Sequence, residues 1–357
     1  MAVLLDTPRT LVMRTFGEDD LPQNLTRLEA FVAGRESLPL SRHPAWLSVL
    51  ADGLQHRPFC LEAVEGEKTR GILPLAHVSG LLFGSFLVSL PYLNYGGVLA
   101  DDEGVARRLI DQAVELAERL DVRYLELRHE RPVDHPSLGH RMQNKVHMRL
   151  PLPNGSEQLW SQLSGKVRNQ VRKGEKSGLS VHWGQQDLLA EFYEVFTRNM
   201  RDLGTPVYGR GLFLSVLRHF PRQAELCVVR AENRAVAAAL LLHGWGVTEV
   251  PSASSLRETN STCANMLMYW HLLKRAIERG QKCFDFGRST PDSNTFQFKK
   301  QWGATPSPAT WQFHLRRGEL GDMRPDHPKH QRRIRLWRRL PVHVTRWLGP
   351  AIVRGIP

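Results

Sequence analysis

Hydrophobic and polar positions along the first half of the chain predict three strands, a helix and a closing strand. The strands are expected at residues 59–64, 71–78 and 86–99, the last with a break. Apolar residues recur at intervals of three and four through residues 104–120, which is the spacing of an amphipathic helix. Asp101 or Asp102 is placed to cap that helix. Residues 123–127 then return as a strand.

The second half repeats this order. Three strands are expected at residues 225–230, 235–243 and 247–252, and the closing strand at 282–286. Between them, apolar positions from Met266 to Ile277 predict a helix, with Asn260 or Ser261 as its cap and Gly280 just beyond its end. A repeated β-β-β-α-β order predicts two similar α/β lobes with mixed sheets.

These elements suggest how the chain is divided. The first lobe is expected at 1–150 and the second at 151–322, with the junction at 151–156, and a basic tail at 323–357. Helices at 159–173 and 187–201 should open the second lobe. Strands linked by hairpins should pair antiparallel, and the strand after each helix should pair parallel.

The net charge of +12 is concentrated in the tail. Residues 324–357 contain nine lysines and arginines and a single acid, Asp326. This segment could pack back on the first lobe, lie on an anionic membrane surface, or contact tRNA phosphates. We favour packing on the first lobe, with peripheral membrane contact as the second interpretation.

The sequence also indicates a compartment. The four cysteines are scattered without a CxxC pair, which is typical of a reducing environment. The N-terminal apolar run is too short for a secretory signal. The uncharged stretch 71–100 is interrupted by prolines and glycines, so strands explain it better than a membrane span. We therefore expect a cytoplasmic protein, with association at the inner membrane left open.

Residues 281–303 carry the most chemistry. A short strand ends at Gly287-Arg288-Ser289, and a polar loop separates it from Phe298, Lys299 and Trp302. Strand ends and loops are where side chains reach ligands. A lysine beside aromatic rings suggests a site for an anion or for a developing oxyanion.

Several segments, taken in order, resemble one family. They are SGKVRNQVRKGEKSGLSVHWG (164–184), GTPVYGRGLF (204–213), FDFGRST (284–290) and FQFKKQWGA (296–304), with SLPYLNYGGVLA (89–100) and LPVHVTRWLGP (340–350). Together they resemble the FemAB-like acyl/aminoacyl transferases, in particular the branch linked to exosortase/PEP-CTERM exopolysaccharide systems. The resemblance implies two GNAT-like lobes and transfer of an acyl or aminoacyl group to an amine.

The resemblance leaves the acyl donor open between acyl-CoA and aminoacyl-tRNA. The turn before the second-half helix, residues 257–264, has no glycine to let a pyrophosphate approach the backbone, which weakens the case for CoA. The long helical arm of some peptidoglycan members has no counterpart here, so no local motif supports tRNA. We expect no resident cofactor.

Lys299 is the first candidate catalytic residue. In the family pattern it matches a lysine near the reacting carbonyl, where it would stabilise the tetrahedral oxyanion. The alternative is a surface lysine whose stem covers the aromatic rings. Asp285 could act as the general base for the amine, or could pair with Arg288 and only hold the loop, which is the role we favour.

The candidate substrate-binding residues are Arg168, Arg172, Tyr208, Arg210, Arg288 and Gln297. Arg168 and Arg172 lie four apart, on one face of a helix that could hold a diphosphate, although most charged runs are solvated faces. Tyr208 and Arg210 follow a turn that could line a cleft or only stabilise a loop. Histidine spacing gives no metal motif, and we expect no metal.

The expected function is N-acyl or aminoacyl transfer to an amine on a phosphate-bearing precursor of the cell envelope or of an exopolysaccharide. The partners would be a nucleotide- or lipid-linked sugar and, as one donor option, aminoacyl-tRNA. The alternative is a non-catalytic protein of the same fold that binds a polyanion or a membrane.

Overall fold

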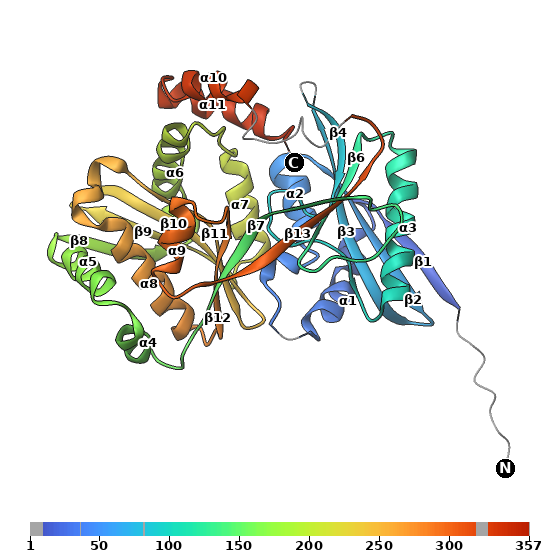
Figure 1. The fold of residues 1–357 in the computed structure, drawn as a ribbon, viewed down its shortest axis with the longest axis horizontal. Coiled ribbons are helices and arrows are strands. Elements are labelled where there is room, and N and C mark those ends of the chain that lie inside the picture. The colour runs from blue at the N-terminus through green and yellow to red at the C-terminus, as the bar shows by residue number, and fades with distance from the viewer. Residues whose placement is uncertain (1–9, 36, 81–82, 319–327, 357) are drawn as a thin grey trace, which may run out of the picture.

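The computed structural model describes residues 10–35, 37–80, 83–318 and 328–356. Within these ranges the strands of both halves join one 13-stranded sheet (Figure 1). Its path runs β1-β2-β3-β4-β6-β13-β7-β12-β11-β10-β9-β8, and β5 pairs with β3 off this path. The second-half strands therefore continue the sheet that the first-half strands begin.

The elements have the following bounds. In the first half they are β1 (Leu11–Phe16), α1 (Leu21–Ala33), α2 (Trp46–Leu54), β2 (Arg57–Glu65), β3 (Lys68–Gly80), β4 (Gly84–Val88), β5 (Leu99–Ala100), α3 (Glu103–Arg119), β6 (Tyr124–His129) and β7 (His140–Pro151). In the second half they are α4 (Ser156–Gln162), α5 (Gly165–Lys176), β8 (Leu179–Gly184), α6 (Leu189–Leu203), α7 (Arg210–His219), β9 (Ala224–Ala231), β10 (Arg234–Gly244), β11 (Val247–Ser255), α8 (Ala264–Glu278), β12 (Cys283–Ser289), α9 (Asn294–Lys300) and β13 (Thr305–Leu315). The tail forms α10 (Pro328–Trp337) and α11 (Val342–Val353).

The predicted repeat is confirmed in its pairing. In each half three strands pair antiparallel, β2-β3-β4 and β9-β10-β11. A helix then crosses over to a strand that pairs parallel: α3 leads to β6 beside β4, and α8 leads to β12 beside β11. Asp102 caps α3 by accepting a hydrogen bond from the Val105 amide (2.9 Å), as expected.

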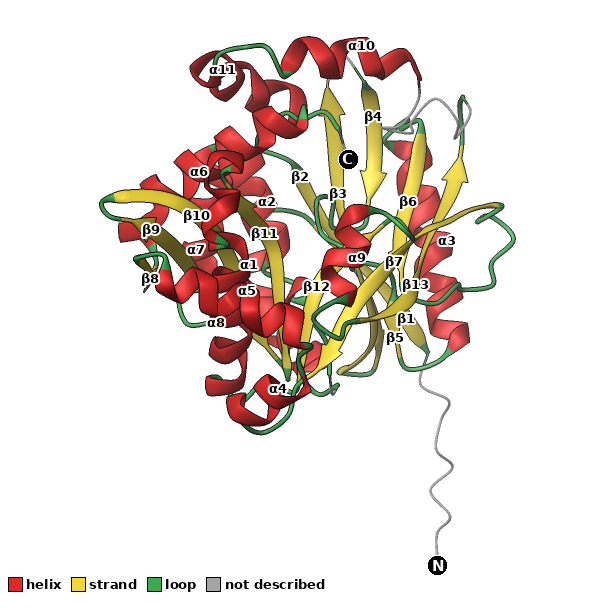
Figure 2. Ribbon diagram, turned by 60° about the vertical axis from the view of Figure 1, so that its left-hand side comes forward, coloured by secondary structure: helices red, strands yellow, loops and turns green. Residues whose placement is uncertain are grey.

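Two long strands join the halves. β7 follows the first-half elements but pairs with β12, while β13 follows the second-half elements and pairs with β6. β7 and β13 also pair with each other, so they form the centre of the sheet (Figure 2). The division at residues 150 and 322 stays a prediction, since each half contributes a strand to the other half's side.

The hydrophobic core lies in layers on both faces of the sheet. α3 packs over the first-half strands and α8 over the second-half strands, each above its own apolar cluster. A third cluster combines residues of both halves, such as Leu28 and Trp46 with Phe192 and Phe213. It forms where α2 packs against α7, so the halves also share a helical core.

Three sequence expectations were wrong in detail. The helix expected at 159–173 is two helices, because Ser164 is extended and caps α5 by accepting from the Val167 amide (3.3 Å). Neither Asn260 nor Ser261 caps α8, since residues 257–262 form a 3-10 turn and Cys263 takes the cap position. The strand expected at 86–99 ends at Val88, and residues 89–98 form a loop.

The tail contacts both halves. α11 packs mainly against α6, in the second half. Its end reaches the first half, where Arg354 donates to the Gln55 side chain (2.7 Å) and Gly355 lies against Gly80. The expected packing on the first lobe is thus confined to the last residues of the chain. Residues 323–327 of the predicted tail lie outside the described residues.

Candidate active site

The neighbouring strands β11 and β12 stay paired for only three residues. Their parallel pairing ends at Glu249 and Asp285, although β11 continues to Ser255 and β12 to Ser289. The pairing of β12 with β7 also shifts register between Asp285 and Arg288. Gly287 lies in this irregularity with φ of 74°, a conformation that favours glycine. The backbone of β12 therefore changes direction at the point where β11 and β12 separate.

Asp285 is held on all sides at this point. It is 1% exposed, accepts from Arg149 Nε (3.0 Å) and from the Gly287 amide (2.7 Å), and accepts the Tyr95 hydroxyl proton. Its ion-pair partner is Arg149 of β7 and not Arg288, as the sequence had suggested. These bonds account for a structural role, and catalysis by Asp285 stays a prediction.

Lys299 of α9 lies on the same irregular segment. Its side chain is 8% exposed, and its ammonium donates to the carbonyls of Gly287 (3.1 Å) and Arg288 (2.8 Å). Burial lowers the pKa of Lys299 to about 8, against the opposing effect of Asp285. The ammonium is thus a buried cation bound to neutral carbonyls.

The aromatic residues expected around the ammonium lie elsewhere. Phe298 and Trp302 pack on Tyr269, with ring centroids 4.8 and 6.2 Å away. Consecutive helical residues point about 100° apart, so Phe298 faces the core under α8 while Lys299 faces β12. The expected position of the ammonium beside these rings was wrong. What holds it is the backbone of Gly287 and Arg288.

Arg288 brings a second cation to this place. Its guanidinium lies 3.7 Å from the ring centroid of Trp311 on β13, and its Nε donates to Asn94 Oδ1 (3.1 Å). Arg128 of β6 lies 4.1 Å from the same centroid. Burial, reinforced by Arg128, lowers the pKa of Arg288 to about 9.

Tyr208 completes this group. It is half-buried, and its pKa is raised by burial while Arg128 and Arg288 act in the opposite direction. Its ring meets Tyr92 edge-on, at 5.4 Å between centroids. We call Arg128, Tyr208, Arg288, Lys299 and Trp311 the cationic cluster. They come from β6, the 204–209 loop, β12, α9 and β13, so both halves build it.

Buried ion pairs and hydrogen bonds hold the residues around the cationic cluster in place. Arg149 also donates to Glu130 (2.8 Å), and Glu130 accepts from Arg42 (3.2 Å). Glu249, beside Asp285, accepts from the Ser41 hydroxyl (2.7 Å) and amide (2.8 Å). Burial, with Asp285 nearby, raises the pKa of Glu249 to about 8. First-half residues thus bind the acids at the end of the β11/β12 pairing.

His147 is a further buried group. It is 1% exposed and stacks on Tyr95 at 4.3 Å between centroids. Neither ring nitrogen has a hydrogen-bond partner among the described residues. Burial lowers the pKa of His147 to about 3, so the ring is neutral. It pairs with Arg288 across β7 and β12, next to the cationic cluster.

The other predicted binding residues lie apart. Arg168 and Arg172 are on α5, where Arg172 stacks over Trp160 at 5.5 Å. Arg210 opens α7 and is exposed, and Gln297 is exposed on α9. Among the described residues, none of these four forms a hydrogen bond or ion pair with the cationic cluster. Their binding roles stay predictions.

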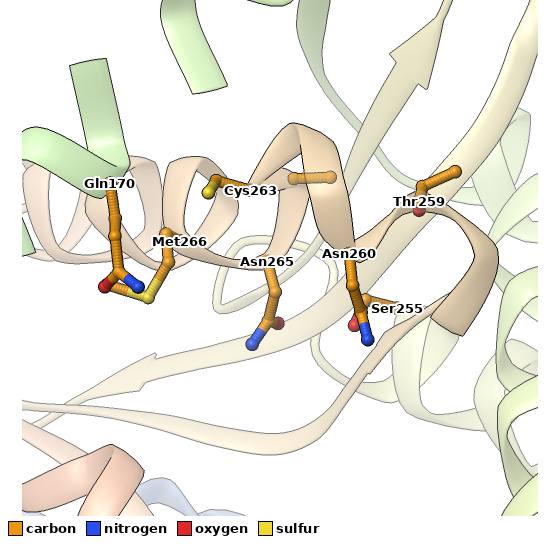
Figure 3. Close-up of a pocket in the computed structure, with 8 residues that line it drawn as sticks. Gln170, Ser255, Thr259, Asn260, Cys263, Asn265 and Met266 are labelled. Atoms are coloured by element: carbon orange, nitrogen blue, oxygen red, sulfur yellow. The ribbon is translucent and has the colours of Figure 1, made fainter. Parts of the chain in front are cut away.

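A cavity of about 170 Å³ lies where α8 begins (Figure 3). It is lined by Gln170, Ser255, Thr259, Asn260, Cys263, Ala264, Asn265 and Met266. All lining residues are uncharged, and Gln170 Oε1 is buried without a partner among the described residues. Cys263 takes φ of 57°, the conformation that glycine favours, so the turn forms without a glycine.

Neither a metal-binding cluster nor a membrane-spanning helix occurs in the part of the chain that the structure describes. The described residues contain no group of three or more His, Cys, Asp or Glu side chains that could hold a metal ion. None of their helices is long and apolar enough to cross a membrane.

Comparison with protein families gives one match, which lies within the second half of the chain. Residues 161–300 match the acetyltransferase (GNAT) domain model. The fold is that of a tandem GNAT protein. A solved tandem GNAT protein from the clavulanic acid biosynthesis pathway has a TM-score of 0.54 and 13% identity, with 86% of this chain and 100% of that chain covered.

Two other solved structures are similar to this chain in fold. FemX has a TM-score of 0.64 and 16% identity, with 82% of this chain and 96% of that chain covered. L-PGS from Bacillus licheniformis has a TM-score of 0.54 and 12% identity, with 82% and 92% covered. A search of curated proteins finds no match. The expected FemAB-like fold is confirmed by these structures.

Proposed function

We propose that this protein transfers an acyl or aminoacyl group to an amine on a phosphate-bearing precursor of the cell envelope or of an exopolysaccharide. The observation that carries the proposal is the buried ammonium of Lys299, held at the separation of β11 and β12 in a tandem GNAT fold. The resemblance to the exosortase-associated branch supports an exopolysaccharide precursor as the acceptor.

In this reaction the amine attacks the carbonyl carbon of a thioester or ester. A C–N bond forms, the carbonyl oxygen becomes an oxyanion, and the Lys299 ammonium stabilises it by donating a hydrogen bond. The C–S or C–O bond then breaks, and the departing sulfur or oxygen takes the proton that the amine loses. A cation whose hydrogen-bond partners are neutral carbonyls suits this role, because no carboxylate bound directly to it offsets its charge.

The anionic part of the acceptor is assigned to Arg288. Its guanidinium lies on Trp311 and forms no ion pair with a carboxylate among the described residues. Arg128 lies on the same ring but is 2% exposed and paired with Glu126 (2.7 Å), so it adds positive charge behind Arg288 without a free hydrogen-bonding face. Phosphate is an anion that guanidinium groups bind with paired hydrogen bonds. Tyr208 borders this position. Arg168 and Arg210 are kept as contacts for more distant parts of the substrate.

The test is turnover by Lys299→Met, which keeps an unbranched apolar stem one atom shorter than that of lysine and removes the charged end. Transfer is followed from labelled acyl-CoA and from charged tRNA to a panel of nucleotide- and lipid-linked amino sugars. We expect a loss of about 10²- to 10³-fold in kcat, as for removal of one oxyanion donor.

Lys300→Met is the matched control, because Lys300 neighbours Lys299 on α9 but is exposed. Its turnover should equal that of the wild type. Unchanged turnover in Lys299→Met would remove this lysine from the mechanism. Absence of transfer from every donor, with retained binding of the acceptor, would instead favour the non-catalytic binding protein.

A further inference from the structure

The two tail helices expose large apolar side chains. Among the described residues the exposed large hydrophobics are Val12, Leu203, Leu336 and Trp347. Leu336 is on α10 at 64% exposed and Trp347 is on α11 at 79%. α10 and α11 lie together at one end of the molecule (Figure 1). A tryptophan that is four-fifths exposed on a helix leaves a large apolar surface in water.

The exposure of Trp347 follows from how α11 is anchored. Thr345, Gly349 and Val353 are buried at intervals of four and face α6 and the 204–209 loop. A side-chain carbon at Gly349 would lie 2.8 Å from the Val207 amide nitrogen, so the helix is in close contact there. Arg346 fixes the flank by donating to Thr197 (3.1 Å). Trp347 therefore stands on the outer face of a helix that cannot turn to bury it.

α10 and the turn after it are fastened in a similar way. Within the helix, Ile334 lies against Gly204. In the turn, Arg338 donates to the carbonyl of Leu203 (3.1 Å), and Arg201 donates to the carbonyl of Leu340 (3.1 Å). Leu336 is two positions from Ile334, which is the opposite side of a helix. Its exposure is thus also set by the anchoring contacts.

Exposed cations lie on either side of Leu336 in the sequence. Arg333 and Arg335 are exposed on α10 and Arg339 is exposed in the turn after it, and none of the three forms an ion pair with a carboxylate of the described residues. The sequence from 327 to 357 contains no acid at all. We call Arg333, Arg335, Leu336, Arg339 and Trp347 the tail face. It combines exposed apolar surface with uncompensated positive charge.

Three kinds of partner could cover the tail face, and its combination of apolar and positive groups distinguishes between them. A second copy of the tail face would bring like charges together. An RNA backbone would bind the arginines but leave Leu336 in water. An anionic bilayer accommodates both, because arginines bind lipid headgroups while Trp and Leu side chains enter the interfacial region. We propose that the tail face docks on an anionic lipid bilayer, with α10 and α11 lying in its surface.

Docking would place the bilayer behind one wall of the candidate site. The inner side of α11 contacts the 204–209 loop, and Tyr92 donates to the carbonyl of Arg354 (3.1 Å). Tyr92 in turn meets Tyr208 of the cationic cluster. An acceptor held in the membrane would thus lie close to the cluster. The docking itself does not depend on the proposed transfer reaction.

The test is co-sedimentation of the full chain with vesicles, which needs no turnover. We expect binding to phosphatidylcholine vesicles that contain phosphatidylglycerol, and none to phosphatidylcholine alone. Leu336→Ser combined with Trp347→Ser should weaken binding about tenfold or more, because the inserted apolar area is lost. Tryptophan emission should shift to the blue on vesicle binding in the wild type and not in this variant.

Val12→Ser is the matched control, since Val12 is an exposed apolar residue on β1, far from the tail in sequence. Thermal unfolding of each variant checks that the fold is retained. Equal vesicle binding by the wild type and the double variant would overturn the proposal. So would a complex with uncharged tRNA, or a dimer, that the wild type forms and the double variant loses in the ultracentrifuge.

Discussion

At the scale of single residues, the charge on Lys299 depends on what its ammonium touches. Two backbone carbonyls solvate it, and the nearest carboxylate, Asp285, is already bound by Arg149. Burial without a dedicated counter-ion disfavours the charged form, and so its pKa falls to about 8. A lysine of this kind titrates within the range where enzymes are assayed.

This titration predicts how transfer depends on pH. The ammonium is charged below its pKa and neutral above it, so kcat should fall as the pH rises through about 8. Lys299→Arg keeps its charge over that range and should show a flat profile, at a lower rate. The measurement is kcat against pH for both proteins, with saturating acceptor. A wild-type profile that stays level well above pH 8 would contradict an ammonium role.

From the sequence alone, the candidate site residues that could be singled out are those that lie close together along the chain. Asp285, Arg288 and Lys299 lie within fifteen positions and were selected from one stretch, and their roles stay predictions. Arg128 and Trp311 were missed, because they reach Arg288 only through the order β6-β13-β7-β12. That order depends on long-range pairing, and no local pattern encodes it.

At the scale of elements, α2 of the first half and α7 of the second half are in close contact. A side-chain carbon at Gly53 would lie 2.8 Å from Leu212 Cα, which is a backbone atom and cannot turn aside. Glycine at this position allows the two helices to touch. The contact joins the core that both halves share.

Gly53→Ala should therefore destabilise the protein. Overpacking costs about 1–3 kcal/mol, and the better helix propensity of alanine offsets up to about 1 kcal/mol. The net loss, about 1–2 kcal/mol, can be measured by urea unfolding. Gly165→Ala is the control, because that helical position has no neighbour within 4 Å and should be neutral or slightly stabilising. Equal stability of the two variants would show that the helices can separate without cost.

Periodicity predicted the repeated elements well and their ends less well. α3 and α8 came from apolar spacing, and Gly280 lies just beyond α8 with φ of 70°, as expected. The start of α8 was missed, because Cys263 adopts a left-handed conformation that residue type does not indicate. β7 was missed because its exposed first half is too polar to stand out.

At the scale of the whole molecule, the sheet and one core cluster both run through the two halves. Neither half has a complete set of strands, because β7 and β13 are exchanged. We therefore expect one cooperative unfolding transition, in spite of the internal repeat. Circular dichroism and tryptophan fluorescence should give the same midpoint in guanidinium. Two separated transitions would mean that the halves fold as independent units.

The repeat itself was visible in the sequence, but the way its copies join was not. Each copy's strands and helix are successive in the chain, so local patterns revealed them. β7 and β13 could each pair with several strands of similar composition. Which strands they pair with depends on the packing of the whole chain. The prediction of two lobes therefore gave the repeated elements but not the central strands β7 and β13, through which the two halves form one sheet.

The continuous sheet also limits how a ligand can arrive. Swinging the halves apart like jaws would break the backbone hydrogen bonds of β6, β13, β7 and β12. Access to Lys299 must then come from rearrangement of side chains and of the 89–98 loop, whose Tyr92 and Asn94 border the arginines. Such motions take nanoseconds to microseconds, faster than the hinge closure that paces many two-domain enzymes. Substrate entry should therefore not be the step that limits the turnover rate.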